Sequence, residues 1–211
     1  MCGRFAVSPA VVENIAVVEV GNPGALQIGA DIRPTTDISA VVATGAGRML
    51  HPMRWGFVPD WYAGPNDGPL LINARAETIA TKPAFRAACR QRRCLIPTSG
   101  FYEWQSLGRQ GKRPYWLQPA HGGAATFAGI WQDWRGADGA VHHSCAIVTC
   151  AASEDLAHIH HRLPVIIEPS NHALWLGEAG RGAATLMHAQ PQGWWQAEPD
   201  RGPPVSSPRL L

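Results

Sequence analysis

The 211-residue sequence lacks any apolar run long enough to cross a membrane as a helix, and it lacks a signal peptide. We therefore expect a cytoplasmic protein. Net charge is also scarce, because 18 Lys and Arg stand against 16 Asp and Glu, and the resulting +2 is too small to indicate a nucleic-acid or membrane partner by itself. Internal repeats, low-complexity tracts and linkers are absent. With 45% apolar residues, the chain is expected to form one domain over 1–211.

Cysteine is present, but not in the pattern of a tight zinc site. The five cysteines are an odd number, and none form a C-x₂-C pair. Cys89 and Cys94 have four residues between them, as do Cys145 and Cys150, which have histidines nearby. That gap is the loose end of the structural zinc range, and a free cysteine in a strand packs as a small hydrophobe. We expect free thiols, no metal and no cofactor.

Hydrophobic patterning predicts many short strands and few helices. Ser8 and Pro9 suit the N-cap and first residue of a helix that ends near Ile15. Further helices are expected at 82–91 and 170–176, with one helical turn after Ser153. Strands are expected at 38–44, 49–57, 70–73, 94–96, 100–104, 113–117, 125–134, 141–150 and 163–167. Because strands and helices do not alternate as βαβ units, we expect an α+β domain around mostly antiparallel sheet. From about residue 190 no element is predicted.

Cys2 becomes the first residue of the chain if the initiator methionine is removed. An N-terminal cysteine has an α-amine and a thiol on adjacent carbons, a pairing that no internal cysteine has. The α-amine has an ordinary pKa of about 7.7–8.0, so part of it is free base at neutral pH. Such an amine condenses with an aldehyde to a Schiff base, and the thiol can then close a five-membered thiazolidine ring. Cys2 is therefore a candidate nucleophile, although a small residue leading into a strand would look the same.

Asn73 and Arg75 are two residues apart, so their side chains face the same way in an extended segment. An amide beside a guanidinium suits an oxygen-rich anion such as phosphate. The pair by itself is also consistent with an ordinary exposed surface.

Glu103 lies among aromatic residues in the segment Gly100–Trp104. Desolvation by aromatic neighbours suits a carboxylate that accepts and returns a proton. Alternation along a strand places Phe101 and Glu103 on one face and Tyr102 on the other. An exposed carboxylate on the wet face of a strand remains an equal alternative.

Three histidines, His158, His160 and His161, precede Arg162. Imidazole titrates near neutral pH and commonly acts as a general acid or base. Residue chemistry alone does not choose among the three, and a solvated loop would have the same composition.

Five motifs in order together resemble one family. They are Met1–Phe5 (MCGRF), 55–59 (WGFVP), 72–78 (INARAET), 100–104 (GFYEW) and 160–164 (HHRLP). The set, spanning residues 2 to about 167, is similar to the SRAP family of SOS response-associated peptidases, abasic-site processing proteins that act on damaged single-stranded DNA. The resemblance implies a single SRAP-like, barrel-like domain.

The resemblance also implies roles for individual residues. Cys2 matches the residue that crosslinks to the ring-opened aldehyde of an abasic site as a thiazolidine. Asn73 would hold the N-terminus, Glu103 would shuttle protons, and His160 would assist ring opening and the reverse reaction. His160 is chosen because the family histidine stands before Arg-x-Pro with one residue between them. Proteolysis is expected only as removal of Met1 by self-processing.

Six further residues match DNA-contact or site-lining positions of that family. Two are cations expected at phosphates, three belong to a hydrophobic loop beside the lesion, and one lines the site: Arg4, Arg75, Trp55, Phe57, Trp61 and Thr149. The implied partner is single-stranded DNA containing an abasic site, bound by a monomer, with the replication machinery as a further partner. A nucleoid-associated cytoplasmic location follows.

Two departures from the family pattern concern DNA affinity. Ala30–Pro34 (ADIRP) replaces the usual Tyr-Asn-x-Ala-Pro, which substitutes a carboxylate for an amide and adds an arginine. The Val-Asn tail typical of the family is also missing near Leu211.

Two other classes fit part of the sequence. An N-terminal-nucleophile glutamine amidotransferase also begins Cys-Gly, with the thiol attacking an amide. A non-catalytic single-strand binding module would use Trp55 and Trp61 as stacking platforms. Substitution of Cys2 by alanine separates these alternatives from covalent trapping.

Overall fold

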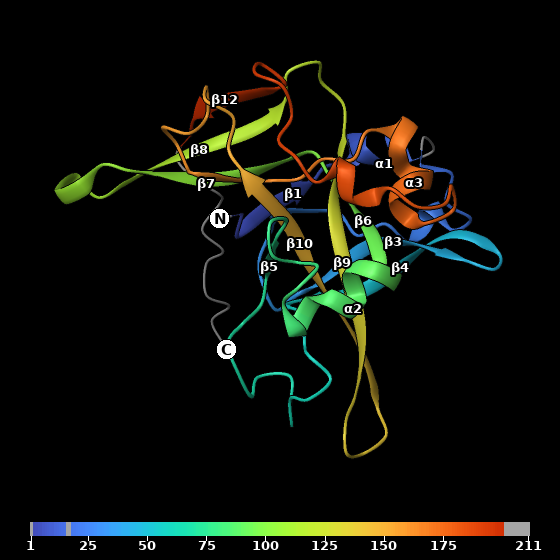
Figure 1. The fold of residues 1–211 in the computed structure, drawn as a ribbon. Coiled ribbons are helices and arrows are strands. Elements are labelled where there is room, and N and C mark those ends of the chain that lie inside the picture. Colours follow the sequence, from blue (N-terminus) through green and yellow to red (C-terminus); the bar gives the residue numbers. More distant parts are fainter. Residues whose placement is uncertain (1, 16–17, 201–211) are drawn as a thin grey trace, which may run out of the picture.

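The computed structural model describes residues 2–15 and 18–200 of the chain (Figure 1). Strands dominate the architecture and the helices are short. The strands are β1 (Arg4–Val7), β2 (Gly29–Ile32), β3 (Asp37–Thr44), β4 (Gly47–Trp55), β5 (Asn73–Arg75), β6 (Arg93–Thr98), β7 (Gly100–Ser106), β8 (Lys112–Pro119), β9 (Ala125–Arg135), β10 (Val141–Ala151), β11 (Arg162–Pro164) and β12 (Trp195–Pro199). The α-helices are α1 (Pro9–Ile15), α2 (Pro83–Gln91) and α3 (His172–Leu176).

Five strands close into a barrel. The order β10-β4-β3-β6-β9 is completed by antiparallel pairing of β9 with β10. Most pairs are antiparallel, but β4 and the short β5 both run parallel to β10. The expected α+β, barrel-like architecture with mostly antiparallel sheet is confirmed.

Strand alternation divides the core into an inner and an outer cluster. Along β10, Cys145 and Ile147 belong to one cluster, whereas Ala146 and Val148 belong to the other. Successive residues of a strand point to opposite faces, so both faces of the barrel wall are buried. The outer cluster is covered by α2, which packs on β6 and β9, and by α3, which packs on β6.

A second sheet covers the inner cluster. Its strand order is β12-β8-β7-β1-β2, and all its pairs are antiparallel. Phe5 of β1, Phe101 of β7 and Leu117 of β8 pack with barrel residues such as Phe127 in the inner cluster. Phe5 and Phe101 each meet Phe127 edge-on, at ring-centroid distances of 5.9 and 6.0 Å. Cys2, directly before β1, therefore lies where the second sheet joins the barrel.

Most predicted elements are present, with differences at the weakest signals. The helix after Ser8, the helix within 82–91 and the long β9–β10 and β7–β8 hairpins match the pattern. The strand expected at 70–73 instead begins at Asn73, whereas the helical turn expected after Ser153 is present and is closed by Ala157 N–H to Ser153 O at 3.0 Å. β2 and β12 were missed because both lie at sheet edges and contain glycine, aspartate or proline, which are depleted in strands.

None of the helices in the described ranges is long and apolar enough to cross a membrane.

Candidate active site

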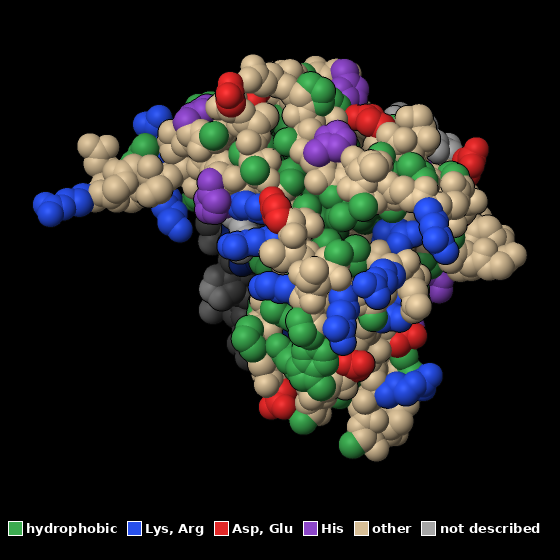
Figure 2. Space-filling model, viewed as in Figure 1, with side chains coloured by type: hydrophobic (Ala, Val, Ile, Leu, Met, Phe, Trp, Pro, Cys, Tyr) green, Lys and Arg blue, Asp and Glu red, His purple; other side chains and the backbone are tan. Residues whose placement is uncertain are grey.

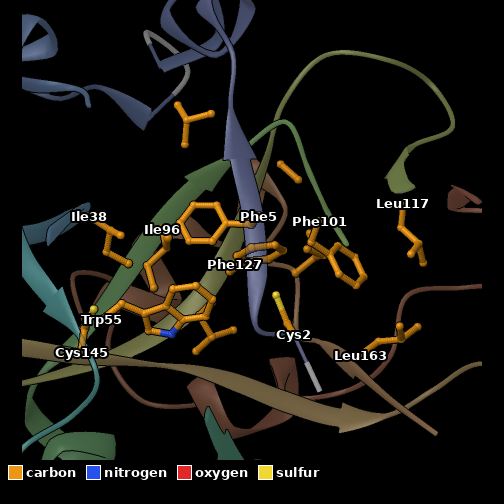
Figure 3. Packing of buried hydrophobic residues seen from close by; sticks show 14 of the residues in the cluster. Cys2, Phe5, Ile38, Trp55, Ile96, Phe101, Leu117, Phe127, Cys145 and Leu163 are labelled. Carbon is orange, nitrogen blue, oxygen red and sulfur yellow. The ribbon is translucent and has the colours of Figure 1, made fainter. Parts of the chain in front are cut away.

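The Cys2 side chain points into the inner core, beside Phe127 and Phe101 (Figure 3). Its accessible surface is 0%, and its Sγ lies 3.9 Å from the carbonyl oxygen of Arg4. Burial raises the pKa of this thiol well above its ordinary value, and the charge of Glu103 raises it further. The thiol is therefore neutral and shielded in this structure.

Asn73 reaches Cys2 from the neighbouring sheet. β5 pairs in parallel with β10, opposite Ile147, and this register directs the Asn73 side chain toward the N-terminus. Its Nδ2 donates a hydrogen bond of 2.9 Å to the carbonyl oxygen of Cys2. Its Oδ1 is buried without a hydrogen-bond partner in the described part of the chain. The amide thus fixes the backbone of Cys2 and keeps an acceptor for a donor that enters the site.

Glu103 is buried on the same face of β7 as Phe101, which confirms the alternation expected for this strand. It is 2% exposed, and its Oε2 accepts a hydrogen bond of 3.3 Å from the backbone N–H of Trp104. Its charge is the second cause of the raised Cys2 pKa, so the carboxylate acts on the thiol environment directly. A carboxylate held inside apolar surroundings suits proton transfer.

His160 completes the group from the segment before β11. Its Nδ1 lies 3.9 Å from Oε1 of Glu103, and it accepts a 3.0 Å hydrogen bond from the backbone N–H of Arg162. The same Nδ1 also lies 3.0 Å from the Arg162 carbonyl oxygen, so either tautomer of the ring finds a partner in the Arg162 backbone. Burial lowers the pKa of His160, while Glu103 acts in the opposite direction. Of the three candidate histidines, His160 is the half-buried one, and His158 and His161 are exposed.

Arg162 and Glu77 form a bracket that sequence reasoning missed. Arg162 is 8% exposed and donates to both carboxylate oxygens of Glu77, at 2.8 and 2.9 Å, which lowers the Glu77 pKa. It also donates to the carbonyl and, at 3.3 Å, to Oγ1 of Thr149. The bracket ties the end of β10 to the segment that carries His160. In the sequence, an arginine next to a strand does not indicate such a role. The contacts of Arg162 with Glu77 and Thr149 become visible only in the structure, where its side chain is buried.

Arg4 lies at the edge of the site and is already engaged by a carboxylate. Its Nη1 is 3.7 Å from Asp31, and its guanidinium lies 5.8 Å from the ring centre of Trp104. Asp31 also accepts two hydrogen bonds from Arg33. The carboxylate that departs from the family pattern is thus shared between two arginines, one of which is the expected phosphate contact.

The other expected DNA-contact residues fall into two groups. Arg75 and Trp61 are exposed, with Trp61 at 59%. Trp55 and Phe57 are 0% and 2% exposed, and the Trp55 indole N–H donates to the Ile72 carbonyl inside the core. Neither side chain is exposed in this structure, and the expectation that Trp55 and Phe57 contact DNA stays a prediction. Sequence does not distinguish an aromatic residue of a loop from one that closes a core.

Thr149 is also fully buried and pairs in register between Arg75 of β5 and Pro164 of β11. Its hydroxyl contacts Arg162, so it supports the bracket from inside.

Histidine, cysteine and carboxylate side chains form no cluster that could hold a metal ion within 2–15 and 18–200.

The fold and site together define a class: a β-barrel domain whose Cys2 is approached by an amide, a carboxylate and an imidazole. The chain belongs to the family described as SOS response associated peptidase (SRAP), whose model matches residues 1–199.

Curated relatives carry consistent names. The chain is 34% identical over 179 residues to the abasic site processing protein YoaM of Bacillus subtilis, covering 83% of this chain and 79% of the relative. It is 31% identical over 195 residues to the abasic site processing protein YedK of Escherichia coli, covering 88% and 85%. With the abasic site processing protein HMCES of Gallus gallus it shares 32% identity over 149 residues, or 60% of this chain and 44% of that protein.

Solved structures confirm the fold. A crystal structure of a Bacteroides thetaiotaomicron protein superposes with a TM-score of 0.82 at 22% identity, covering 95% of this chain and 92% of that one. A Bordetella bronchiseptica protein gives a TM-score of 0.80 at 21% identity, covering 95% of this chain and 100% of that one.

Proposed function

We infer that this chain traps abasic sites in single-stranded DNA by a covalent bond through Cys2. The observation that carries the proposal is the convergence of Asn73, Glu103 and His160, from three separate segments, on the N-terminal residue. The family membership and the printed names of the relatives, abasic site processing proteins, support it.

The reaction uses both reactive atoms of Cys2 once Met1 has been removed. The free α-amine adds to the aldehyde carbon of the ring-opened deoxyribose and gives a carbinolamine. Loss of one water leaves an imine, a recognised form of covalent catalysis. The thiol sulfur then adds to the imine carbon and its proton passes to the nitrogen, which closes the thiazolidine. The overall change is one C–N bond and one C–S bond formed with one water released.

Each neighbouring side chain has a task in this sequence. Glu103 accepts a proton from the attacking amine and returns one to the departing hydroxyl, as general acid–base catalysis requires. His160 donates a proton to the ring oxygen as the deoxyribose opens. Asn73 holds the Cys2 carbonyl at 2.9 Å and offers Oδ1 to an N–H of the α-amine. Together they orient the α-amine. The α-amine is the first nucleophile, because the thiol is buried.

The buried thiol explains the order of the two bond-forming steps. A thiol whose pKa is raised by burial stays protonated near neutral pH, and a protonated thiol is a poor nucleophile. Once the imine is tethered to the same residue, the thiol attacks within one side chain, and proximity compensates for its low reactivity. Other aldehydes that cannot be positioned beside Cys2 are therefore not trapped.

Recognition of an abasic site relies on the strand and not on bases. The lesion has no base edge to contact, so phosphate contacts and shape have to suffice. Arg75 and Trp61 are the exposed candidates for such contacts at this site.

The test is denaturing electrophoresis after mixing the protein, with Met1 removed, with single-stranded DNA carrying one abasic site. A heat-stable conjugate is expected, and undamaged DNA or Cys2→Ala protein should give none. Retained DNA binding with no conjugate from wild type would instead support a non-catalytic single-strand module. Cys2-dependent glutamine hydrolysis would support the amidotransferase alternative.

A further inference from the structure

The exposed side of α2 carries three cations in a row. Lys82, Arg86 and Arg90 are each four residues apart, so they lie along one side of the helix. All three are exposed, whereas Phe85 and Ala88 of the same helix are buried. We call Lys82, Arg86 and Arg90 the cationic stripe.

No carboxylate in the described part of the chain forms an ion pair with the cationic stripe. Between Glu77 and Glu103 the sequence contains five cations and no acidic residue. Two of the five are used internally, because Arg92 donates to Trp131 and Gln132 and Arg93 donates to backbone carbonyls. The side chains of the cationic stripe make no hydrogen bond or ion pair with any residue that the structure describes. Like charges four apart on a helix repel each other, so an anionic partner is the missing component.

The cationic stripe begins at the site and ends at a cavity. Two successive turns, closed by Ile79 N–H to Arg75 O at 2.8 Å and Lys82 N–H to Thr78 O at 2.9 Å, connect the exposed end of β5 to α2. Figure 2 shows Lys and Arg side chains in a band across this face of the molecule.

At the far end, a cavity of about 460 Å³ is lined by Arg90, Arg93 and Arg181. Burial lowers the pKa of Arg93 there, and no carboxylate opposes that effect.

We propose that the cationic stripe binds the sugar–phosphate backbone of the DNA strand that continues from the lesion past Arg75. This inference rests on the proposed function. Four helical residues advance about 6 Å, so the stripe spreads its three charges over about 12 Å of an extended strand. Binding of this kind is independent of sequence and weakens with salt. The stripe is thus a second contact region that extends the footprint beyond the nucleotides at Cys2.

The composition of this surface favours a nucleic-acid strand over a membrane or a protein. Docking to either of these needs apolar anchors next to the charge. The large exposed hydrophobic residues of the described chain lie on other segments, and they are Val12, Ile28, Trp61, Leu70 and Val141.

The test compares oligonucleotides of about 4 and about 16 nucleotides, the range of single-strand footprints. Fluorescence anisotropy is measured on Cys2→Ala protein, so that binding is non-covalent, with and without Lys82→Gln, Arg86→Gln and Arg90→Gln together. Glutamine is a good helix former and keeps α2 intact. The charge-matched control is Arg109→Gln, Lys112→Gln and Arg113→Gln, three exposed cations on the projecting β7–β8 hairpin.

The stripe variant should lose about tenfold in affinity for the long strand, and its log–log salt slope should fall by about 2, since each single-strand phosphate contact contributes about 0.7. Affinity for the short strand should be unchanged, as should all values of the hairpin control. Unchanged long-strand affinity would overturn the proposal, and so would an equal loss in the control. Absence of any conjugate between wild type and short abasic DNA would instead count against the proposed function alone.

Discussion

Cys2 and Cys145 are both buried completely within the same inner core cluster, yet their surroundings differ in kind. Burial is the main cause that raises the pKa of each thiol. Cys145 lies in the middle of β10, with its Sγ 3.7 Å from the Arg54 carbonyl. Cys2 lies at a chain end, with Asn73 on its carbonyl and the charge of Glu103 acting on it.

Both residues are buried thiols, so neither the thiol nor its burial distinguishes the candidate active site from the rest of the core. Polar side chains inside a core cost free energy unless something requires them there. Cys145 packs among apolar side chains of the inner cluster and fills space, although the charge of Asp37 also raises its pKa. At Cys2 an amide oxygen is left buried without a partner, and a carboxylate and an imidazole lie 3.9 Å apart.

The largest expected effect comes from replacing each of the two cysteines by alanine and comparing the two variants. Cys2→Ala should abolish the heat-stable conjugate with abasic DNA, because it removes the thiol that closes the thiazolidine and leaves at most a hydrolysable imine on the α-amine. Cys145→Ala should leave conjugate formation intact and lower the free energy of unfolding by about 1 kcal/mol, the cost of a small buried cavity. Gel quantification and urea unfolding measure the two quantities. Equal losses of conjugate in both variants would remove the distinction.

Glu103→Gln tests whether the polar neighbours act on Cys2. The amide keeps the size of the side chain but cannot exchange a proton, so the rate of conjugate formation should fall by about 10²- to 10⁴-fold. Single-turnover kinetics with abasic DNA measures this rate. A rate within twofold of wild type would assign Glu103 to packing.

A second comparison is between two histidines, His160 at the candidate site and His172 elsewhere in the core. His172 lies away from Cys2, with its Nε2 2.9 Å from Thr126 Oγ1, and burial lowers its pKa to about 4. The unfolded state, with a pKa of about 6.5, therefore binds more protons than the folded state between these values. The contribution of this group to stability is present above about pH 6.5 and is lost as the pH falls toward 4.

Unfolding free energies should therefore show a loss of about 2 kcal/mol between about pH 7 and about pH 5 in wild type that His172→Gln lacks. Conjugate formation should be unaffected by this substitution. An identical pH dependence in both proteins would contradict the assignment.

Asn73→Ala removes one hydrogen bond to Cys2 and should slow conjugate formation by about tenfold, the equivalent of about 1.4 kcal/mol. Single-turnover kinetics with saturating abasic DNA isolates this effect from DNA binding. Asn73→Asp serves as the control, because it retains the acceptor oxygen and loses the Nδ2 donor. Rates that match wild type in both variants would remove Asn73 from the site.

The smallest expected effect concerns Asp31. Asp31→Asn would release Arg4 and Arg33 from a shared carboxylate, and affinity for undamaged single-stranded DNA should rise by about two- to fivefold at low salt. Anisotropy titrations on Cys2→Ala protein measure the change, and it should shrink as salt is added. Lower affinity would show that Asp31 orients Arg4 for phosphate instead of competing with it.

Local patterning predicted most strands and the helices α1, α2 and α3, because alternation and capping are encoded within a few residues. It could not separate Trp55 and Phe57 from Trp61, since the three differ only in tertiary burial. The Arg162–Glu77 bracket was out of reach for the same reason, as its partners are 85 residues apart.

The candidate site shows the same division between local and tertiary information. Cys2, Asn73, Glu103 and His160 were named from motifs, but their convergence depends on the closure of the barrel by β9 and β10 and on the pairing of β5 with β10. A chemical role could be predicted for each residue from its motif, but only the fold shows that the four residues lie close together.

The central claim is tested most directly by the intact mass of the conjugate formed with abasic single-stranded DNA. The account predicts the mass of the chain without Met1 plus that of the DNA minus one water, with the modification on the peptide that begins at Cys2. A conjugate on a lysine, or no conjugate from protein with a confirmed free Cys2 terminus, would contradict it.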